Sequence, residues 1–157
     1  MKTSIRNRKS GFTLVEILIV VIILGILAAI VIPQFTNAST SARVASLQGQ
    51  LQTLRSQIQL FKLQHNDVLP DLVTNQWSQM MSKTNVSGAV DTTATGLYGP
   101  YLESTPANPL NSNSTVAGAA GTGVGWIYSN TGANAGIITA TNQTPTVVFN
   151  ESTAVVQ

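Results

Sequence analysis

The chain has 157 residues, of which 43% are hydrophobic and only 9% are charged. This length supports one domain with a modest core and excludes most large enzyme architectures. The absence of cysteine excludes disulfides, thiolate nucleophiles and cysteine-ligated metals. So few charges, together with a mean hydropathy of +0.20, indicate either a membrane segment or an unusually neutral surface.

The net charge of +2 is an end effect. Half of the cations, Lys2, Arg6, Arg8 and Lys9, lie in the first nine residues, and no Lys or Arg follows Lys83. Binding to a phosphate backbone depends on cations that neutralise it. We therefore expect no nucleic-acid partner for this chain.

Residues 12–32 form an apolar run that only Thr13, Glu16 and Gly25 interrupt. As a helix this run is about 31 Å long, which matches the hydrocarbon core of a bilayer. It is too long for a secretory signal peptide. An uncleaved anchor with a cytoplasmic basic flank fits its length, but leaves Glu16 unexplained, because a carboxylate in a spanning helix costs about 2.5–3.5 kcal/mol. We expect Glu16 to have an intermolecular partner or a functional role.

The stretch KSGFTLVE, Lys9–Glu16, followed by the apolar run and Pro33, resembles the N-terminal signature of type IV pilins and type II secretion pseudopilins. The resemblance implies that residues 1–11 are a leader, which a prepilin peptidase removes by cutting after Gly11 and methylating Phe12. It implies that residues 12–33 form the membrane and filament-core helix, and that residues 34–157 hold the rest of the helix and a periplasmic head.

The same resemblance gives Glu16 a partner. Cleavage creates an α-ammonium on Phe12, and in a filament Glu16 of one subunit would meet the Phe12 ammonium of a neighbour. Such a pair is strong in a low-dielectric core, whereas either charge alone is costly there. We therefore predict that this pair selects the register between subunits.

Beyond Pro33 the sequence predicts that the helix continues to about Leu63 and ends near residues 65–67. An apolar stripe recurs at steps of three and four: Val44, Leu47, Leu51, Leu54, Ile58 and Phe61. The opposite face is expected to be solvated: Gln48, Gln50, Gln52, Arg55, Ser56, Gln59 and Lys62. Gly25 and Pro33 predict a kink or local loss of helix between them. The alternative is that Pro33 ends a short anchor helix and a separate helix follows.

The head is expected to be small and mixed in structure. Residues 71–83 predict a second helix that begins at Asp71 or Thr74 and fills the core with Val73, Trp77, Met80 and Met81. Residues 125–129 and 136–140 predict a β-hairpin, and residues 146–150 predict a further strand. An antiparallel sheet on the apolar stripe gives an α+β, pilin-like fold, in which the long N-terminal helix packs its C-terminal half against the sheet.

Catalytic residues are not evident. His65 is the only histidine, and no nucleophile or acid is spaced to act with it. We interpret it as a surface or capping residue. The sequence contains no nucleophile elbow, Walker A loop or His-Glu-x-x-His pair. We therefore predict that the protein is not an enzyme.

Part of the head carries a second resemblance. Residues 98–102 and 106–111, with the hairpin at 126–140, are similar to the G-type, or major, pseudopilins of type II secretion systems. The resemblance implies a calcium ion in loops near the C-terminal strands, held by Asp carboxylates and carbonyls. No Asp follows Asp91 in this chain, and calcium sites usually need several oxygen ligands that include carboxylates. We expect no cofactor and transfer no metal ligands.

The resemblances imply a structural subunit of a type II secretion pseudopilus, which supports protein export. Its partners would be the prepilin peptidase, other copies of the chain, minor pseudopilins, the inner-membrane assembly platform and, before assembly, lipid. The N-terminus would be cytoplasmic and the head periplasmic. One alternative is a type IV pilin, although many major pilins carry a disulfide that this chain lacks. The other is a membrane-anchored binding module that never polymerises, against which the Gly11–Phe12 junction and Glu16 argue.

Overall fold

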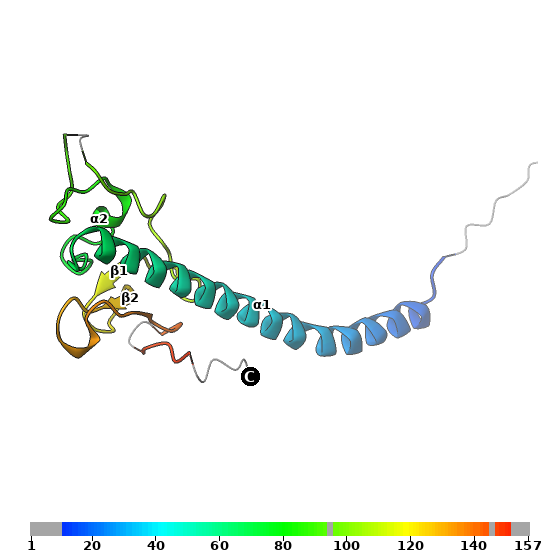
Figure 1. The fold of residues 1–157 in the computed structure, drawn as a ribbon. Helices are drawn as coiled ribbons and strands as arrows, with labels where there is room; N and C mark the ends of the chain where they lie inside the picture. The colour runs from blue at the N-terminus through cyan, green and yellow to red at the C-terminus, as the bar shows by residue number, and fades with distance from the viewer. Residues whose placement is uncertain (1–10, 94–95, 145–146, 152–157) are drawn as a thin grey trace, which may run out of the picture. The chain divides into compact units, whose positions relative to one another are not determined.

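The computed structural model describes residues 11–93, 96–144 and 147–151, and divides into two compact units, Met1–Ser39 and Thr40–Gln157. Its elements are shown in Figure 1. In chain order they are α1 (Leu14–Gln64), α2 (Ser78–Met81), β1 (Thr115–Ala117), β2 (Val124–Tyr128), the short 3-10 helix η1 (Gly132–Asn134) and β3 (Ile138–Ala140).

The described part of the first unit consists of Gly11, the two residues after it and the first half of α1. The helix is continuous through Pro33, so the predicted single long helix is confirmed and the alternative of two separate helices is wrong. Its large apolar side chains from residue 12 to residue 32 are exposed. By length and composition α1 can cross a membrane. The kink between Gly25 and Pro33 stays a prediction.

The second unit is built on the later turns of α1. The predicted stripe is confirmed, because Leu47, Leu51, Leu54, Ile58 and Phe61 are at most 2% exposed and Val44 packs beside them. In Figure 1 the strands β1 and β2 lie beside these turns of the helix. The stripe and side chains from all three strands form one apolar cluster. Burial of this stripe is what attaches the helix to the sheet.

Helix α1 ends where the sequence predicts. The N–H of Asp67 donates to the carbonyl of Lys62 at 3.0 Å, and Asn66 adopts a left-handed conformation with φ of 52°. A bond that spans five residues around a left-handed residue is a common way to close a helix. Asn is one of the few residues other than Gly that adopts this conformation readily.

His65 is not on the surface, which corrects one part of its interpretation. Its ring is completely buried and stacks on Phe61, with the ring centroids 4.0 Å apart. Nδ1 donates to the Phe61 carbonyl at 2.7 Å, and Nε2 lies 2.9 Å from the Thr84 hydroxyl oxygen. The capping part of the interpretation is confirmed, because the Phe61 carbonyl belongs to the last turn of α1. His65 is buried because the loop that contains Thr84 packs against its ring. The sequence alone does not show that this loop lies beside the end of the helix.

The second predicted helix is much shorter than expected. Only Ser78–Met81 is helical, whereas residues 71–77 form turns. Gln76 has a φ of 50°, which no helix tolerates, and its side-chain amide bonds both the N–H and the carbonyl of Val116. Gln76 therefore covers the outer edge of β1 as a neighbouring strand would. Trp77 and Met80 are buried as predicted, but Val73 is 37% exposed.

The sheet confirms the α+β fold class and adds a strand. Strands β2 and β3 are antiparallel, which confirms the predicted hairpin, but β1 pairs parallel with β2, so the three-stranded sheet is mixed. Of the strand predicted at 146–150, Val148 makes an isolated bridge with Thr141 and Phe149 donates its N–H to Ala140. Thr146 lies outside the described residues.

Arg55 departs from the expected solvated face of α1. Its guanidinium donates to the Ile138 carbonyl at 3.1 Å and pairs with the Glu151 carboxylate. The hydrogen bond from Arg55 lowers the pKa of Glu151 below its ordinary value. Arg55 thus ties α1 to β3 and to the segment that follows the sheet.

Tyr128 supplies a stability test. Its side chain is 1% exposed, and its hydroxyl has no hydrogen-bond partner in the described part of the chain. Burial, with a smaller effect of the Asp71 charge, raises the pKa of Tyr128 to about 12. We predict that Tyr128→Phe raises the free energy of unfolding by up to about 1 kcal/mol at pH 7, because an unsatisfied buried hydroxyl is removed. Chemical denaturation of the full chain in detergent measures this.

The same variant has a pH signature. The raised pKa means that the neutral phenol of Tyr128 is compatible with folding below pH 10, and that stability is lost as pH rises from about 10 towards 12. We expect the wild type to lose more stability than Tyr128→Phe across this window. Equal losses, or a variant clearly less stable at pH 7, would contradict the unsatisfied phenol.

Candidate functional site

The processing junction lies just before the first turn of α1. Gly11 and Phe12 precede the helix, which begins at Leu14, and the Phe12 side chain is 77% exposed. No other described atom lies within 4 Å of where a Gly11 side chain would begin. A peptide bond in this setting is accessible to a protease, because neither helix hydrogen bonds nor packing hold it.

The side chains of Thr13 and Glu16 cap the start of the helix reciprocally. The Glu16 N–H donates to the Thr13 hydroxyl at 3.2 Å, and the Thr13 N–H donates to the Glu16 carboxylate at 3.5 Å. This is a capping box, in which two otherwise unpaired backbone donors are satisfied. Sequence reasoning missed the role of Thr13, although Thr followed three residues later by Glu is the signature of this motif.

The Glu16 carboxylate keeps most of its capacity to accept hydrogen bonds. Among the described residues its one hydrogen bond is the long contact to Thr13, whereas an ionised carboxylate has about four acceptor positions. Glu16 is the only charged residue among residues 11–39. Within the described part of the first unit the carboxylate therefore has no cation to pair with.

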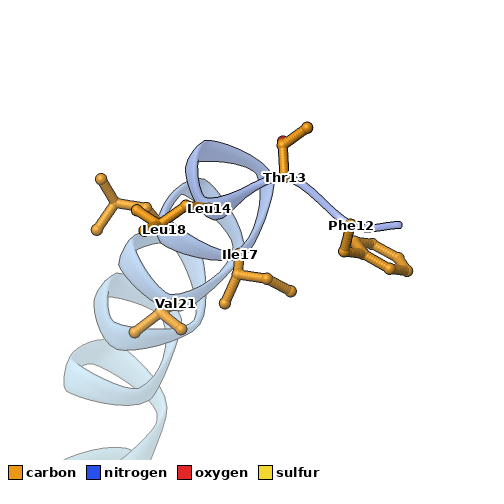
Figure 2. Close-up of a pocket in the computed structure, with 6 residues that line it drawn as sticks. All are labelled: Phe12, Thr13, Leu14, Ile17, Leu18 and Val21. Atoms are coloured by element: carbon orange, nitrogen blue, oxygen red, sulfur yellow. The ribbon is translucent and has the colours of Figure 1, made fainter. Parts of the chain in front are cut away.

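The same turns carry an open apolar hollow of about 490 Å³, lined by Phe12, Thr13, Leu14, Ile17, Leu18 and Val21. Figure 2 shows these side chains pointing outward from the helix, with Phe12 beyond its first turn. Exposed apolar surface of this extent marks a contact with lipid or with another protein. The site thus combines an accessible cleavage point, a carboxylate and an apolar surface.

Gly25 and Pro33 lie further along α1 and do not join this site. Both are exposed, and no side chain lies within 4 Å of the position that a Cβ on Gly25 would take. Pro33 has no N–H, so the helix lacks its hydrogen bond to the Ala29 carbonyl. The two residues weaken this stretch of helix without breaking it in the single subunit.

The loops beside the C-terminal strands hold amides where a metal would need oxygens. Asn108 is fully buried and its Nδ2 donates to the carbonyls of Gly125 and Thr141, at 2.9 and 2.7 Å. Asn111 donates to the Thr141 hydroxyl at 2.7 Å and to the Asn142 carbonyl at 3.0 Å. We call this set the amide clamp. It presents N–H donors to the carbonyls, so the residues do not fit calcium, which is held by oxygen ligands.

Carboxylates do not gather elsewhere in the described residues either. Among residues 11–93, 96–144 and 147–151, no group of three or more His, Cys, Asp or Glu side chains lies where it could hold a metal ion.

Comparison with known proteins places these features in a family. A family model described as the prokaryotic N-terminal methylation motif matches residues 6–32. The type II secretion system core protein G of Pseudomonas aeruginosa is 43% identical over 58 residues, which cover 37% of this chain and 41% of that protein. The corresponding protein of Aeromonas hydrophila is 34% identical over 61 residues, covering 39% and 43%. The chain thus spans less than half the length of these two relatives.

Fimbrial protein Q of Moraxella bovis matches more of the chain. It is 30% identical over 127 residues, which cover 72% of this chain and 77% of that protein. No solved structure matches the chain. The match to fimbrial protein Q extends beyond the methylation motif into the head.

An exposed apolar helix with a processing motif at its start, continued into an α+β head, defines a pilin-like protein. The chain belongs to the type IV pilin and type II secretion pseudopilin family. The predicted resemblance is confirmed, as is the prediction that the protein is not an enzyme, because members of this family are structural filament subunits. The apolar start of α1 fits an inner-membrane-anchored subunit.

The amide clamp gives a direct test of metal dependence. We predict that Asn108→Ala lowers the free energy of unfolding by about 1–3 kcal/mol, because buried backbone groups lose their partner. The matched control is Asn134→Ala, since that residue is exposed and lies outside the clamp, and surface changes stay within about 0.5 kcal/mol. Adding calcium or EGTA should leave the Tm of the wild type unchanged in a thermal scan. A Tm that rises with calcium would overturn the exclusion of the metal.

Proposed function

We propose that this chain is the structural subunit of a type II secretion pseudopilus, a filament of processed, membrane-anchored subunits that supports protein export. The observation that carries the proposal is the loop at residues 106–111, which is bound to the β2–β3 hairpin. The Trp126 ring N–H donates to the Pro106 carbonyl at 2.9 Å, and Asn108 bonds both strands' ends. This loop and hairpin are the part of the head that is similar to G-type pseudopilins.

Each part of the chain has its own processing step or location in this function. A prepilin peptidase removes residues 1–11 and methylates Phe12, and residues 12–33 remain as the membrane and filament-core helix. Residues 34–157 form the helix continuation and the periplasmic head, while the leader faces the cytoplasm. Minor pseudopilins and an inner-membrane assembly platform are the further partners. Exposure of the Gly11–Phe12 junction supports the first step.

Glu16 would give the filament its register. The apolar turns of α1 contact lipid before assembly and other helices after it, so hydrophobicity alone favours assembly little. An ion pair between Glu16 and the Phe12 ammonium of a neighbour is strong in such a low-dielectric setting. The free acceptor capacity of the Glu16 carboxylate supports this pairing. Small side chains at Ala28 and Ala29 allow close helix packing.

A type IV pilin of a surface filament is the second candidate. The observation that favours it is the match to fimbrial protein Q, which covers 77% of that protein and extends into the head. A type IV pilin would use the same processing, the same Glu16 pair and the same helix packing. The two candidates differ in filament length and in what the cell loses without the protein.

Deletion and overexpression distinguish the candidates. We expect deletion of the gene to abolish release of folded proteins into the medium and to leave twitching motility and surface pili intact. Immunoblots of the culture medium and electron microscopy of the cells measure both outcomes. Loss of long surface pili with normal protein release would favour the pilin. A wild-type chain that forms no filament of either kind, even when overexpressed, would support the non-polymerising module and contradict both candidates.

A pair of substitutions separates the two roles of Glu16. Glu16→Gln keeps a side chain that can complete the capping box but removes the charge. We predict that this variant inserts and is processed normally but does not enter filaments. Thr13→Ala removes the hydroxyl cap and keeps the charge, and should still assemble. Immunoblots of processed subunit and sheared filament fractions measure the two steps. Normal assembly of Glu16→Gln would refute the charge pair.

A further inference from the structure

A second candidate contact surface lies in the head, on the unit that holds the sheet. A groove of about 340 Å³ runs between α1 and the loop that follows Tyr101, and its lining is Gly49, Gln50, Thr53, Leu54, Leu102, Ser104 and Pro106. The loop wall is held firmly, because the N–H groups of Tyr101 and Leu102 both donate to the Met80 carbonyl. We call this the 49–106 groove.

The groove has a buried acceptor in its lining and a negative charge beside it. The side-chain carbonyl oxygen of Gln50 is buried and has no hydrogen-bond partner in the described part of the chain. Glu103 lies between two lining residues, Leu102 and Ser104, and is exposed. The lining therefore holds a buried acceptor and no charged residue, and the Glu103 carboxylate is the charge that lies beside it along the chain.

Most charges of the processed chain already have an opposite charge or a hydrogen-bond donor nearby. Arg55 pairs with Glu151, and Lys62 lies 3.9 Å from Asp67. The Asp71 carboxylate accepts hydrogen bonds from the Thr74 N–H and from the side chain of Asn130. The Asp91 carboxylate accepts a hydrogen bond from the Thr93 N–H. The remaining charges beyond Glu16 are Arg43, Lys83 and Glu103.

Lys83 and Asp91 lie beside each other. Their Cβ atoms are 2.6 and 3.2 Å from the point where a Cβ on Gly96 would lie, and the Asp91 N–H donates to the Lys83 carbonyl. Among the described residues Arg43 and Glu103 are both exposed and form no salt bridge, and the exposed Lys83 forms none either.

Arg43 lies on α1 in a position suited to reach a neighbour's groove. It precedes Gln50 by seven residues, so the two side chains are on the same face of the helix, about 10 Å apart along its axis. A second copy displaced by this distance along α1 would bring its Arg43 level with the groove. The displacement is head to tail, and such contacts build open helical assemblies.

We propose that the 49–106 groove binds Arg43 of the next copy of this chain, with Glu103 as its ionic partner. The proposal rests on the filament proposed above and adds a specific contact between heads. The Arg43 stem would pack on Leu102 and Pro106, and its guanidinium, with five donors, would bond the Glu103 carboxylate at the rim of the groove. A single ion pair at an exposed site is weak, but one made at every subunit can set the spacing of heads.

A lipid headgroup is a poorer partner for Arg43. The residue lies about 16 Å beyond the end of the apolar run at Ile32, by the rise of a helix. The headgroup layer on one side of a bilayer is only about 5–8 Å thick. Contact with an anionic lipid is retained as an outcome of the test, because it predicts an effect on membrane retention and none on assembly.

Charge reversal in the full chain tests the contact. We expect Arg43→Glu and Glu103→Arg each to lower the sheared filament fraction about tenfold or more, because like charges then meet across the interface. The double variant should restore assembly. Lys83→Glu, the reversal of an exposed cation outside the groove, is the matched control and should assemble normally. No restoration in the double variant, equal loss in the control, or loss of membrane retention alone would overturn the proposal.

Cross-linking gives a readout that does not depend on filament yield. The chain has no cysteine, so Arg43→Cys and Glu103→Cys introduce the only thiols. Cells that express both single variants together should give a dimer with a short bismaleimide, whereas either variant alone should not. The Glu16→Gln background should abolish the dimer. Dimers of Arg43→Cys alone, or filaments without a mixed dimer, would contradict the contact.

The two proposals fail in different ways. If wild-type filaments form and neither charge reversal nor cross-linking detects the contact, only the Arg43 inference is wrong. If the wild type forms no filament at all, the proposed function is wrong first. A dimer that persists in the Glu16→Gln background would show a contact independent of filament assembly and would overturn the inference as stated.

Discussion

The apolar side chains of α1 are arranged differently in the two parts of one continuous helix, and the other features of the chain follow from this difference. From Phe12 to Ile32 apolar side chains surround the helix and are exposed in the single subunit. From Leu47 to Phe61 they form one buried stripe against the sheet. The first pattern requires lipid or other helices, because no soluble surface tolerates it. The second pattern anchors a small head, which could not bury enough surface without the helix.

Glu16 illustrates how one side chain can act locally and between molecules. Its N–H and carboxylate close the capping box with Thr13, which fixes where the helix begins. The same carboxylate keeps acceptors for a partner from outside the subunit. These two roles differ in what they require, since the cap needs a hydrogen-bond acceptor and the proposed pair needs a charge. A glutamine can supply only the first.

The head is held together by neutral polar groups where other proteins use ions or metals. Asn108 and Asn111 tie the loop before the sheet to both strands of the hairpin. Gln76 pairs with the backbone of Val116 at the outer edge of β1. Amides are uncharged, so they can be buried at modest cost when every bond is made. Such a construction leaves few charges in the head.

Periodicity and motif spacing in the sequence determined the long helix, its buried stripe, its end before Asp67, the β2–β3 hairpin and the processing motif around Gly11 and Glu16, because these depend on residues close in the chain. Tertiary structure alone decided the rest. His65 is buried because Thr84 folds over it, and α2 is short because Gln76 bonds a strand that lies far along the chain. The parallel pairing of β1 was not predictable, since the connection at residues 118–123 is shorter than the dozen or so residues that parallel strands usually need. Contacts between residues remote in sequence leave no periodic signal, so only the fold reveals them.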